Sequence, residues 1–247
     1  MVCIVRVEEM PRLREPVLIE GLPGIGFVAN IAALHLLREL EMKRFATIYS
    51  SSFQDFIITT EGGGLRPPIN ELYYYAGRGE ERDAILLYGN TQALTSRGQY
   101  ELCGRILDVA QELGCKFVVT MGGLRVDRRV TQPRLHCAAT DHETLCSVLG
   151  LGVNVLTGNI YGAAGILLGL AKLREMRGVC ILAETPGFYP DAAAAKEVLQ
   201  LLCRVTNWKV DLSKLEEAAK TTQDMLRTFG VAFEEEEEEK KTFRGLV

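Results

Sequence analysis

The sequence lacks the features of several common protein classes. It has no continuous hydrophobic run of the roughly 18 residues that a membrane-spanning helix needs, because glycine and asparagine interrupt the most apolar stretch, residues 153–173. It has no basic cluster, and its formal net charge is −4, so electrostatics give no reason to expect binding to nucleic acid. We therefore expect a soluble, cytoplasmic protein without a membrane or nucleic-acid partner.

Motifs of catalysis and metal binding are also absent. The chain contains no Gly-Lys-Ser/Thr phosphate loop, no G-x-S-x-G nucleophile elbow and no H-E-x-x-H zinc motif. Its seven cysteines are scattered without a Cys-x-x-Cys pair, which is typical of reduced thiols buried in an intracellular protein. His136, Cys137, His142 and Cys146 lie close in sequence, but an adjacent histidine and cysteine rarely both reach one tetrahedral ion. We predict no metal site, no cofactor and no catalytic residue.

What the sequence does contain is an alternation of short apolar strands and longer amphipathic helices. Four apolar runs each lead through a glycine-containing loop, which is typical of parallel strands with crossover connections. These runs begin at Val17, Ala84, Phe117 and Val179. Strand candidates between residues 45 and 75 stand too close together for intervening helices, which predicts an antiparallel meander at one edge. We predict one α/β domain over residues 1–230, with a mixed, mostly parallel sheet.

The individual elements follow from the spacing of apolar residues. The predicted strands are Cys3–Val7, Val17–Glu20, Phe45–Tyr49, Phe56–Thr60, Leu72–Tyr75, Ala84–Tyr88, Phe117–Met121 and Val179–Ala183. The predicted helices cover residues 27–40, 102–113, 163–176 and 192–205, with Asp191 as the cap of the last one.

The C-terminal part of the chain has a helix followed by a charged segment. Ser213 and Glu216 form a capping-box pattern that predicts a helix over residues 213–229, ended by Gly230. Six consecutive glutamates, 234–239, repel one another and predict a flexible, solvated acidic tail over residues 231–247. The tail ends in a short apolar segment that it holds away from the domain.

A glycine-rich turn joins the second predicted strand to the first predicted helix. Gly24, Gly26 and Ala29 fit the G-x-G-x-x-G/A pattern of dinucleotide-binding turns. The pattern also requires an acidic residue at the end of the next strand, where this chain has Ser50 to Ser52 instead. Glycines are equally needed where a backbone adopts positive φ or packs closely. Structural or partner-binding use is therefore favoured over nucleotide binding.

Polar residues follow the predicted parallel strands, where ligands collect in open α/β sheets. The candidate ligand or rim residues are Gly24, Gly26, Asn90, Thr91, Arg125 and Glu184. In a hydrolytic or phosphorolytic site, Arg125 would hold an anion and Glu184 would act as a base. The alternative is that these loops only turn the chain and that arginine and glutamate form ordinary surface ion pairs.

Several segments, in order, resemble the proteasome assembly chaperone 2 family in its archaeal and bacterial branch. They are Ile-Glu-Gly-Leu-Pro-Gly-Ile-Gly at 19–26, Arg-Pro-Pro at 66–68, Glu-Leu-Gly at 112–114, Met-Gly-Gly-Leu at 121–124, Ala-Thr-Asp at 139–141, the small residues of 158–169, and Ala-Glu-Thr-Pro-Gly-Phe-Tyr-Pro-Asp at 183–191. The first and last are specific, and together the segments span most of the chain.

The resemblance implies a three-layer α/β/α fold similar to nucleoside phosphorylases, self-association into homo-oligomers, and binding to proteasome subunits without catalysis. Some archaeal members dock a flexible C-terminus, ending in a hydrophobic-Tyr-any-residue motif, between α-ring subunits. This chain ends in Gly-Leu-Val and lacks the tyrosine, so tail docking would depend on Phe243, Leu246 and Val247.

Two functions follow from these observations. The first is a non-catalytic homo-oligomeric chaperone or adaptor that binds proteasome core-particle α subunits. The alternative is a nucleoside- or nucleotide-binding enzyme of the phosphorylase type, or of the ATP-grasp type with which the family has been loosely grouped, although the phosphate-binding lysine is missing.

Overall fold

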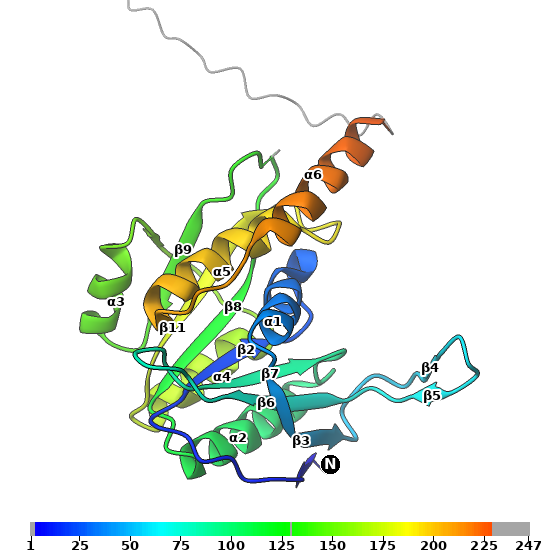
Figure 1. Cartoon of the computed structure of the whole chain (residues 1–247), viewed down its shortest axis with the longest axis vertical. Coiled ribbons are helices and arrows are strands. Elements are labelled where there is room, and N and C mark those ends of the chain that lie inside the picture. The colour runs from blue at the N-terminus through cyan, green and yellow to red at the C-terminus, as the bar shows by residue number, and fades with distance from the viewer. Residues whose placement is uncertain (1–2, 129, 229–247) are drawn as a thin grey trace, which may run out of the picture.

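A nine-stranded mixed sheet forms the centre of the computed structural model, which describes residues 3–128 and 130–228 (Figure 1). The strand order is β1-β3-β6-β7-β2-β8-β11-β9-β10. The strands of this sheet are β1 (Cys3–Val7), β2 (Val17–Gly21), β3 (Lys43–Ser50), β6 (Asn70–Tyr75), β7 (Ala84–Gly89), β8 (Phe117–Arg125), β9 (Leu135–Ala139), β10 (Asn154–Val155) and β11 (Arg177–Thr185).

Parallel strands occupy the middle of this sheet. Strands β7, β2, β8 and β11 pair in parallel. This confirms the prediction made from the four apolar runs that each lead into a glycine-containing loop. Strands β1, β3, β6 and β7 pair antiparallel at one side, which confirms the predicted meander, and β9 runs antiparallel to β11. With the parallel pair of β9 and β10, the nine-stranded sheet has four parallel and four antiparallel pairings. The prediction of a mostly parallel sheet is wrong, because the three antiparallel pairings among β1, β3, β6 and β7 already equal the three parallel pairings among β7, β2, β8 and β11.

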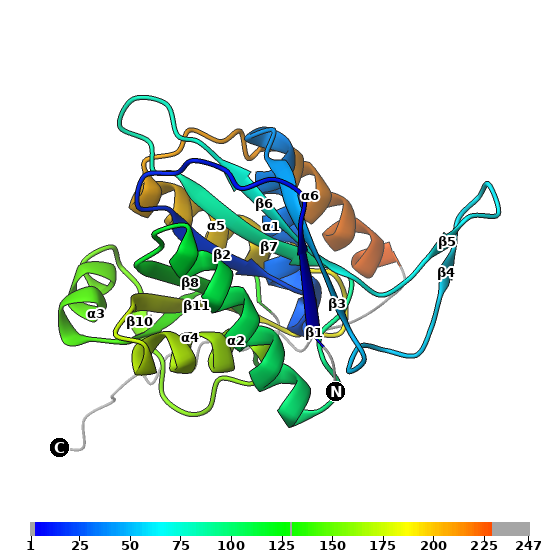
Figure 2. The ribbon, with the colours of Figure 1, turned by 90° about the horizontal axis from the view of Figure 1, so that it is seen from below.

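Helices cover both faces of the sheet and give the predicted three layers (Figure 2). On one face lie α1 (Val28–Glu39), α5 (Ala192–Thr206) and α6 (Ser213–Thr228), with the short α3 (His142–Leu149) at the side; α2 (Ser96–Glu112) and α4 (Gly162–Leu173) lie on the other. Strand β2 is buried on both faces, since Ile19 packs toward α1 and α5 whereas Leu18 packs toward α2 and α4.

One predicted strand lies outside the sheet. Only Ile58–Thr59 (β4) of the predicted strand at 56–60 is extended, and it pairs with Leu65–Arg66 (β5) in a separate hairpin. The hairpin projects from the body of the molecule (Figure 1). Phe56, Ile57, Ile58 and Leu65 are all exposed there. The apolar residues of the strand predicted at 56–60 therefore do not contribute to the core of this chain.

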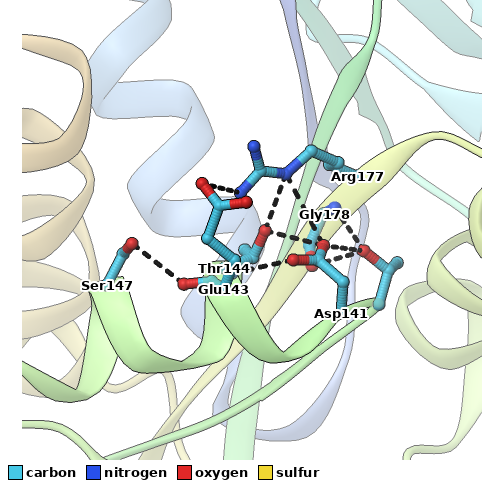
Figure 3. A network of polar contacts seen from close by, with 7 residues as sticks. Asp141, Glu143, Thr144, Ser147, Arg177 and Gly178 are labelled. Atoms are coloured by element: carbon cyan, nitrogen blue, oxygen red, sulfur yellow. Dashed lines mark hydrogen bonds and ion pairs between the residues drawn. The ribbon is translucent and has the colours of Figure 1, made fainter.

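The region from 135 to 155 contains elements that the periodicity did not predict. Helix α3 begins after Asp141, whose carboxylate accepts hydrogen bonds from the Thr144 amide (2.8 Å) and hydroxyl (2.7 Å). Arg177, at the start of β11, joins the same network, which ties α3 to the sheet (Figure 3). The hydrogen bonds from Thr144, helped by Thr140 and the Arg177 charge, lower the pKa of Asp141 to about 2. The Ala-Thr-Asp segment thus caps a helix.

The C-terminal helix starts at the predicted residue with a different cap. Ser213 does not complete a capping box; its amide and its hydroxyl both donate to the Asp211 carboxylate, at 2.9 Å each. Helix α6 is described to Thr228. Gly230, the acidic tail 231–247 and the partner-binding candidates Phe243, Leu246 and Val247 all lie outside the described residues.

Candidate functional site

The two most specific sequence segments pack against each other at the carboxyl ends of β2 and β11. Gly26 lies in a short 3-10 turn, η1 (Ile25–Phe27), with φ of +60°, and a Cβ there would stand 3.0 Å from the Thr185 Oγ1. The Gly26 carbonyl accepts a hydrogen bond from the Asp191 amide at 2.9 Å. Glycine at this position therefore allows the turn to contact the loop that follows β11.

The same loop is fixed to the start of α5. The Thr185 hydroxyl donates to Asp191 Oδ2 at 2.7 Å, and Asp191 Oδ1 accepts from the Ala194 amide at 2.9 Å, which confirms Asp191 as the cap. Gly187 has φ of +82°, and a Cβ there would stand 2.9 Å from Ile25. These contacts hold the two loops as one rigid structure.

Large apolar side chains project from these two loops. We call Ile25, Phe27 and Phe188 the apolar rim; Phe27 is 47% exposed and Phe188 is 61% exposed. Phe27 has φ of +52°, a left-handed conformation that is unfavourable for an aromatic residue. Strain of this kind is typical of functional positions, and exposed aromatic residues on a rigid surface are typical of protein interfaces.

Gly24 and Arg125, two of the predicted rim residues, line a cavity of about 390 Å³. Gly24 is extended, with φ of −156°, and a Cβ there would meet no atom within 4 Å. Its backbone therefore borders open space, in contrast to Gly26. Arg125 is largely exposed and pairs with Asp127, with 3.6 Å between Nε and Oδ1.

A buried acid lines the same cavity. Glu20 on β2 is 2% exposed, and its carboxylate accepts hydrogen bonds from the amides of Leu22 (2.9 Å) and Met121 (3.4 Å). Burial raises the pKa of Glu20 to about 7, and the two amide hydrogen bonds only partly offset this effect. The sequence offered a signal for this residue, because Glu20 is the one charge in an otherwise apolar strand.

Gln92 forms another wall of the cavity and connects three segments. Its side-chain amide donates to the Pro23 carbonyl at 2.6 Å, and its oxygen accepts from the Ala163 amide at 3.0 Å, at the start of α4. Gln99 on α2 donates to the same oxygen at 2.7 Å. The sequence analysis selected its neighbours Asn90 and Thr91 instead, because a glutamine in a polar loop is not part of any recognised binding motif.

Asn90 and Thr91 are placed beside this site but do not line the cavity. Asn90 accepts a hydrogen bond from the Ile69 amide at 3.0 Å and donates to the Pro67 carbonyl at 3.4 Å. Thr91 is buried and donates to the Gln92 carbonyl at 3.0 Å. In this structure the Asn90 side chain holds the loop after β7 against the segment before β6, whereas the Thr91 hydrogen bond stays within that loop.

Glu184 belongs to a separate cluster of basic residues. Its carboxylate contacts Arg128 at 2.5 Å, His136 at 3.2 Å and Arg134 at 3.5 Å. Burial acts to raise the pKa of Glu184, but the hydrogen bond from His136 and the charges of Arg128 and Arg134 outweigh it, so the pKa is lowered. Since Arg125 pairs with Asp127 instead, the structure does not bring Arg125 and Glu184 together as a clamp and a base.

The remaining candidates concern metals and membranes. Within residues 3–128 and 130–228, no three histidine, cysteine or acidic side chains gather as metal ligands would. Of the four residues considered at 136–146, His142 and Cys146 approach each other, with 3.4 Å between Nε2 and Sγ, whereas Cys137 is buried in β9. None of the helices over those residues combines the length and the apolar character that crossing a bilayer requires.

Comparisons with known proteins agree with the resemblance seen in the sequence. The model of the PAC2 family matches residues 18–229. The crystal structure of Pyrococcus furiosus PbaB, an archaeal proteasome activator, superposes with a TM-score of 0.86 and 38% identity, covering 92% of this chain and 98% of PbaB.

Two further relatives cover nearly the whole chain. P. furiosus PbaA, an archaeal homolog of proteasome-assembly chaperone, has a TM-score of 0.77 and 25% identity, with 91% of each chain covered. The uncharacterised protein MJ1210 of Methanocaldococcus jannaschii is 34% identical over 233 residues, which are 94% of this chain and 89% of MJ1210. The chain belongs to the PAC2 family.

Proposed function

We propose that this protein is a non-catalytic, homo-oligomeric, cytoplasmic adaptor or chaperone that binds the α subunits of a proteasome core particle. The observation that supports this most strongly is the match to PbaB, a proteasome activator, over 92% of this chain at 38% identity. PbaA, a homolog of proteasome-assembly chaperone, has the same fold.

The geometry of the site favours binding to a protein. The apolar rim is held by hydrogen bonds between two loops, so it can contact a partner with little loss of conformational entropy. Aromatic anchors such as Phe27 and Phe188 provide large contact areas at the centres of interfaces. We propose that the apolar rim contacts the proteasome subunit.

The C-terminal tail supplies a second, tethered contact. The sequence of residues 231–247 predicts a flexible coil, and a coil of that length would span on the order of 20–25 Å. Phe243, Leu246 and Val247 at its tip would then bind the same partner, and two linked contacts strengthen each other through effective concentration.

Self-association is the third part of the proposal. A two-stranded hairpin is only marginally stable by itself in water, and β4–β5 exposes four large apolar side chains. Contact with a second copy of the chain would cover them.

Binding to purified archaeal α subunits tests the proposal. Full-length protein and a version lacking residues 231–247 are compared with the double variant Phe27→Ala/Phe188→Ala. Leu173→Ala, an exposed apolar side chain on α4, is the matched control. We expect the rim variant to bind at least about tenfold more weakly, because aromatic anchors provide a large part of the binding energy of an interface. The control should bind as tightly as the unaltered protein. Absence of binding by both the full-length and the shortened protein would leave the assignment without support.

The cavity beside Gly24 and Arg125 keeps the nucleoside-phosphorylase-like enzyme as a second candidate. A thermal-shift panel of ATP, NAD, nucleosides and phosphate tests it. A ligand at about 100 times its dissociation constant stabilises the folded state by about 2.7 kcal/mol, which a thermal shift detects readily. A panel without any shift would remove this candidate.

A further inference from the structure

The cavity at the carboxyl ends of β2 and β8 contains a buried acid, Glu20, to which the proposed binding of the proteasome gives no role. Glu20 lines it from within the sheet, and the other walls are largely apolar, with Leu22, Ile25, Ile160 and Leu182 among them. Its volume of about 390 Å³ falls in the range of small-molecule sites, roughly 300–1,000 Å³. It is therefore large enough for an organic ligand.

Burial of Glu20 is unfavourable unless something compensates for it. An ionised carboxylate removed from water destabilises the fold unless a cation or several hydrogen bonds pair with it. Among the described residues, no lysine or arginine side chain forms an ion pair with Glu20. Its hydrogen bond to Leu22, at 2.9 Å, could be made equally well by the neutral oxygen of a glutamine. The negative charge is thus available to a ligand.

We infer that this cavity binds a small molecule that carries a protonated amine on an apolar body, with the ammonium group against the Glu20 carboxylate. The apolar walls take the body of the ligand, and Glu20 supplies the missing countercharge.

Other groups at the cavity do not favour an anion instead. Arg125 pairs with Asp127, so its charge is balanced within the same loop. The Ala163 amide, at the start of α4, is already used by the Gln92 side chain. An acidic ligand would also be repelled by Glu20 itself.

Binding of an amine against Glu20 depends on pH in a defined direction. The titratable groups that interact with Glu20 are the thiols of Cys103 and Cys180, and Arg125 lines the same cavity without contributing to the pKa shift of Glu20. Burial raises the pKa of both thiols, that of Cys180 to about 12, so they stay neutral. The pKa of Glu20 is about 7, so the carboxylate is present above neutrality and protonated below it. Amine binding should therefore strengthen as the pH rises.

Calorimetric titration of the full chain with phenethylammonium chloride tests the inference, with 2-phenylethanol as the neutral probe of similar shape. At about pH 8 we expect the amine to bind about tenfold more tightly than the alcohol, and at about pH 5.5 the preference should largely disappear. Glu20→Gln should abolish the preference at the higher pH and leave alcohol binding unchanged.

A second variant locates the ligand without altering Glu20. Gly24 lines the cavity on an extended backbone, and a Cβ there meets no atom within 4 Å, so Gly24→Leu adds a side chain at the cavity wall and should weaken binding of both probes at least about tenfold. Unchanged binding in this variant would place the probes elsewhere and overturn the inference.

Three other results would also overturn it: equal affinity for the two probes at the higher pH, no binding of either probe, or a preference that persists in Glu20→Gln. If Glu20→Gln does not fold, the pH comparison on the unaltered protein and the Gly24→Leu variant decide the matter. Because no proteasome subunit is present in the experiment, its outcome is separate from that of the proposed function.

Discussion

Gly24 and Gly26 are two residues apart, yet their surroundings differ completely. Gly26 has positive φ and contacts Thr185, whereas Gly24 is extended and faces open space. We predict that Gly26→Ala lowers the free energy of unfolding by about 1–3 kcal/mol and that Gly24→Ala changes it by less than about 0.5 kcal/mol. Urea unfolding measures both. Equal changes in the free energy of unfolding for the two variants would contradict the difference in backbone conformation and packing between the two glycines.

The basic cluster around Glu184 makes a second prediction at this scale. Glu184→Gln leaves Arg128 without its buried countercharge and changes the hydrogen-bond partner of His136, although Arg134 is exposed and can return to water. We expect a loss of about 2 kcal/mol in the free energy of unfolding. Asp127→Asn, which removes an exposed partner of Arg125 in the neighbouring loop, should leave the unfolding midpoint unchanged.

Glu20 predicts how stability changes with pH. In the unfolded chain its pKa is 4.5, whereas in the folded protein it is about 7. Between these values the unfolded state loses its proton first, so the folded state is progressively destabilised as the pH rises, and the penalty is constant above about 7. Relative to Glu20→Gln, the unaltered protein should lose about 2–3 kcal/mol between about pH 5 and pH 8. Parallel stability profiles for the two proteins would contradict a raised pKa.

At the scale of elements, the hairpin β4–β5 is the clearest candidate for a contact between copies. Its apolar residues contribute nothing to the described core. Ile57→Ser/Leu65→Ser should leave the unfolding midpoint nearly unchanged and lower the mass measured by light scattering toward that of one chain. Leu173→Ser, which changes an even more exposed apolar side chain on α4, serves as the control. An unchanged assembly mass in the hairpin variant would exclude this surface from self-association.

The sequence could predict elements whose apolar period is long and regular. The parallel strands β2, β7, β8 and β11 and the helices α1, α2, α4 and α5 all follow such patterns. Strand β9 and helix α3 are short, and a cap at Asp141 rather than periodicity defines where α3 begins. The strand predicted at 56–60 was misplaced because an exposed apolar hairpin has the same pattern as a core strand.

The position of the candidate site could be predicted from the sequence, but the side-chain contacts within it could not. Its loops could be located from the carboxyl ends of parallel strands, but contacts between distant segments could not. Gln92 becomes part of the cavity wall through hydrogen bonds to Pro23 and Ala163, which are distant in sequence. Arg128 and His136 likewise approach Glu184 only in the folded chain. Loop position follows from local sequence, whereas side-chain pairing depends on the tertiary structure.

At the scale of the whole molecule, the sheet places a rigid apolar surface and a small cavity at the carboxyl ends of its parallel strands. The surface suits a protein partner and the cavity suits a small amine, so the two can be tested independently. The chain belongs to the PAC2 family and shares its fold with PbaB, an archaeal proteasome activator, and with PbaA, an archaeal homolog of proteasome-assembly chaperone. Binding to the proteasome is thus the function proposed for this chain.

Binding to the proteasome can be measured by sedimentation velocity of the full-length chain mixed with purified archaeal proteasome core particles. We predict that the chain co-sediments with the core particle and that Phe27→Ala/Phe188→Ala returns most of it to the slow boundary, whereas Leu173→Ala does not. If the full-length chain sediments separately from core particles and from free α subunits at micromolar concentrations, the account of its function is contradicted.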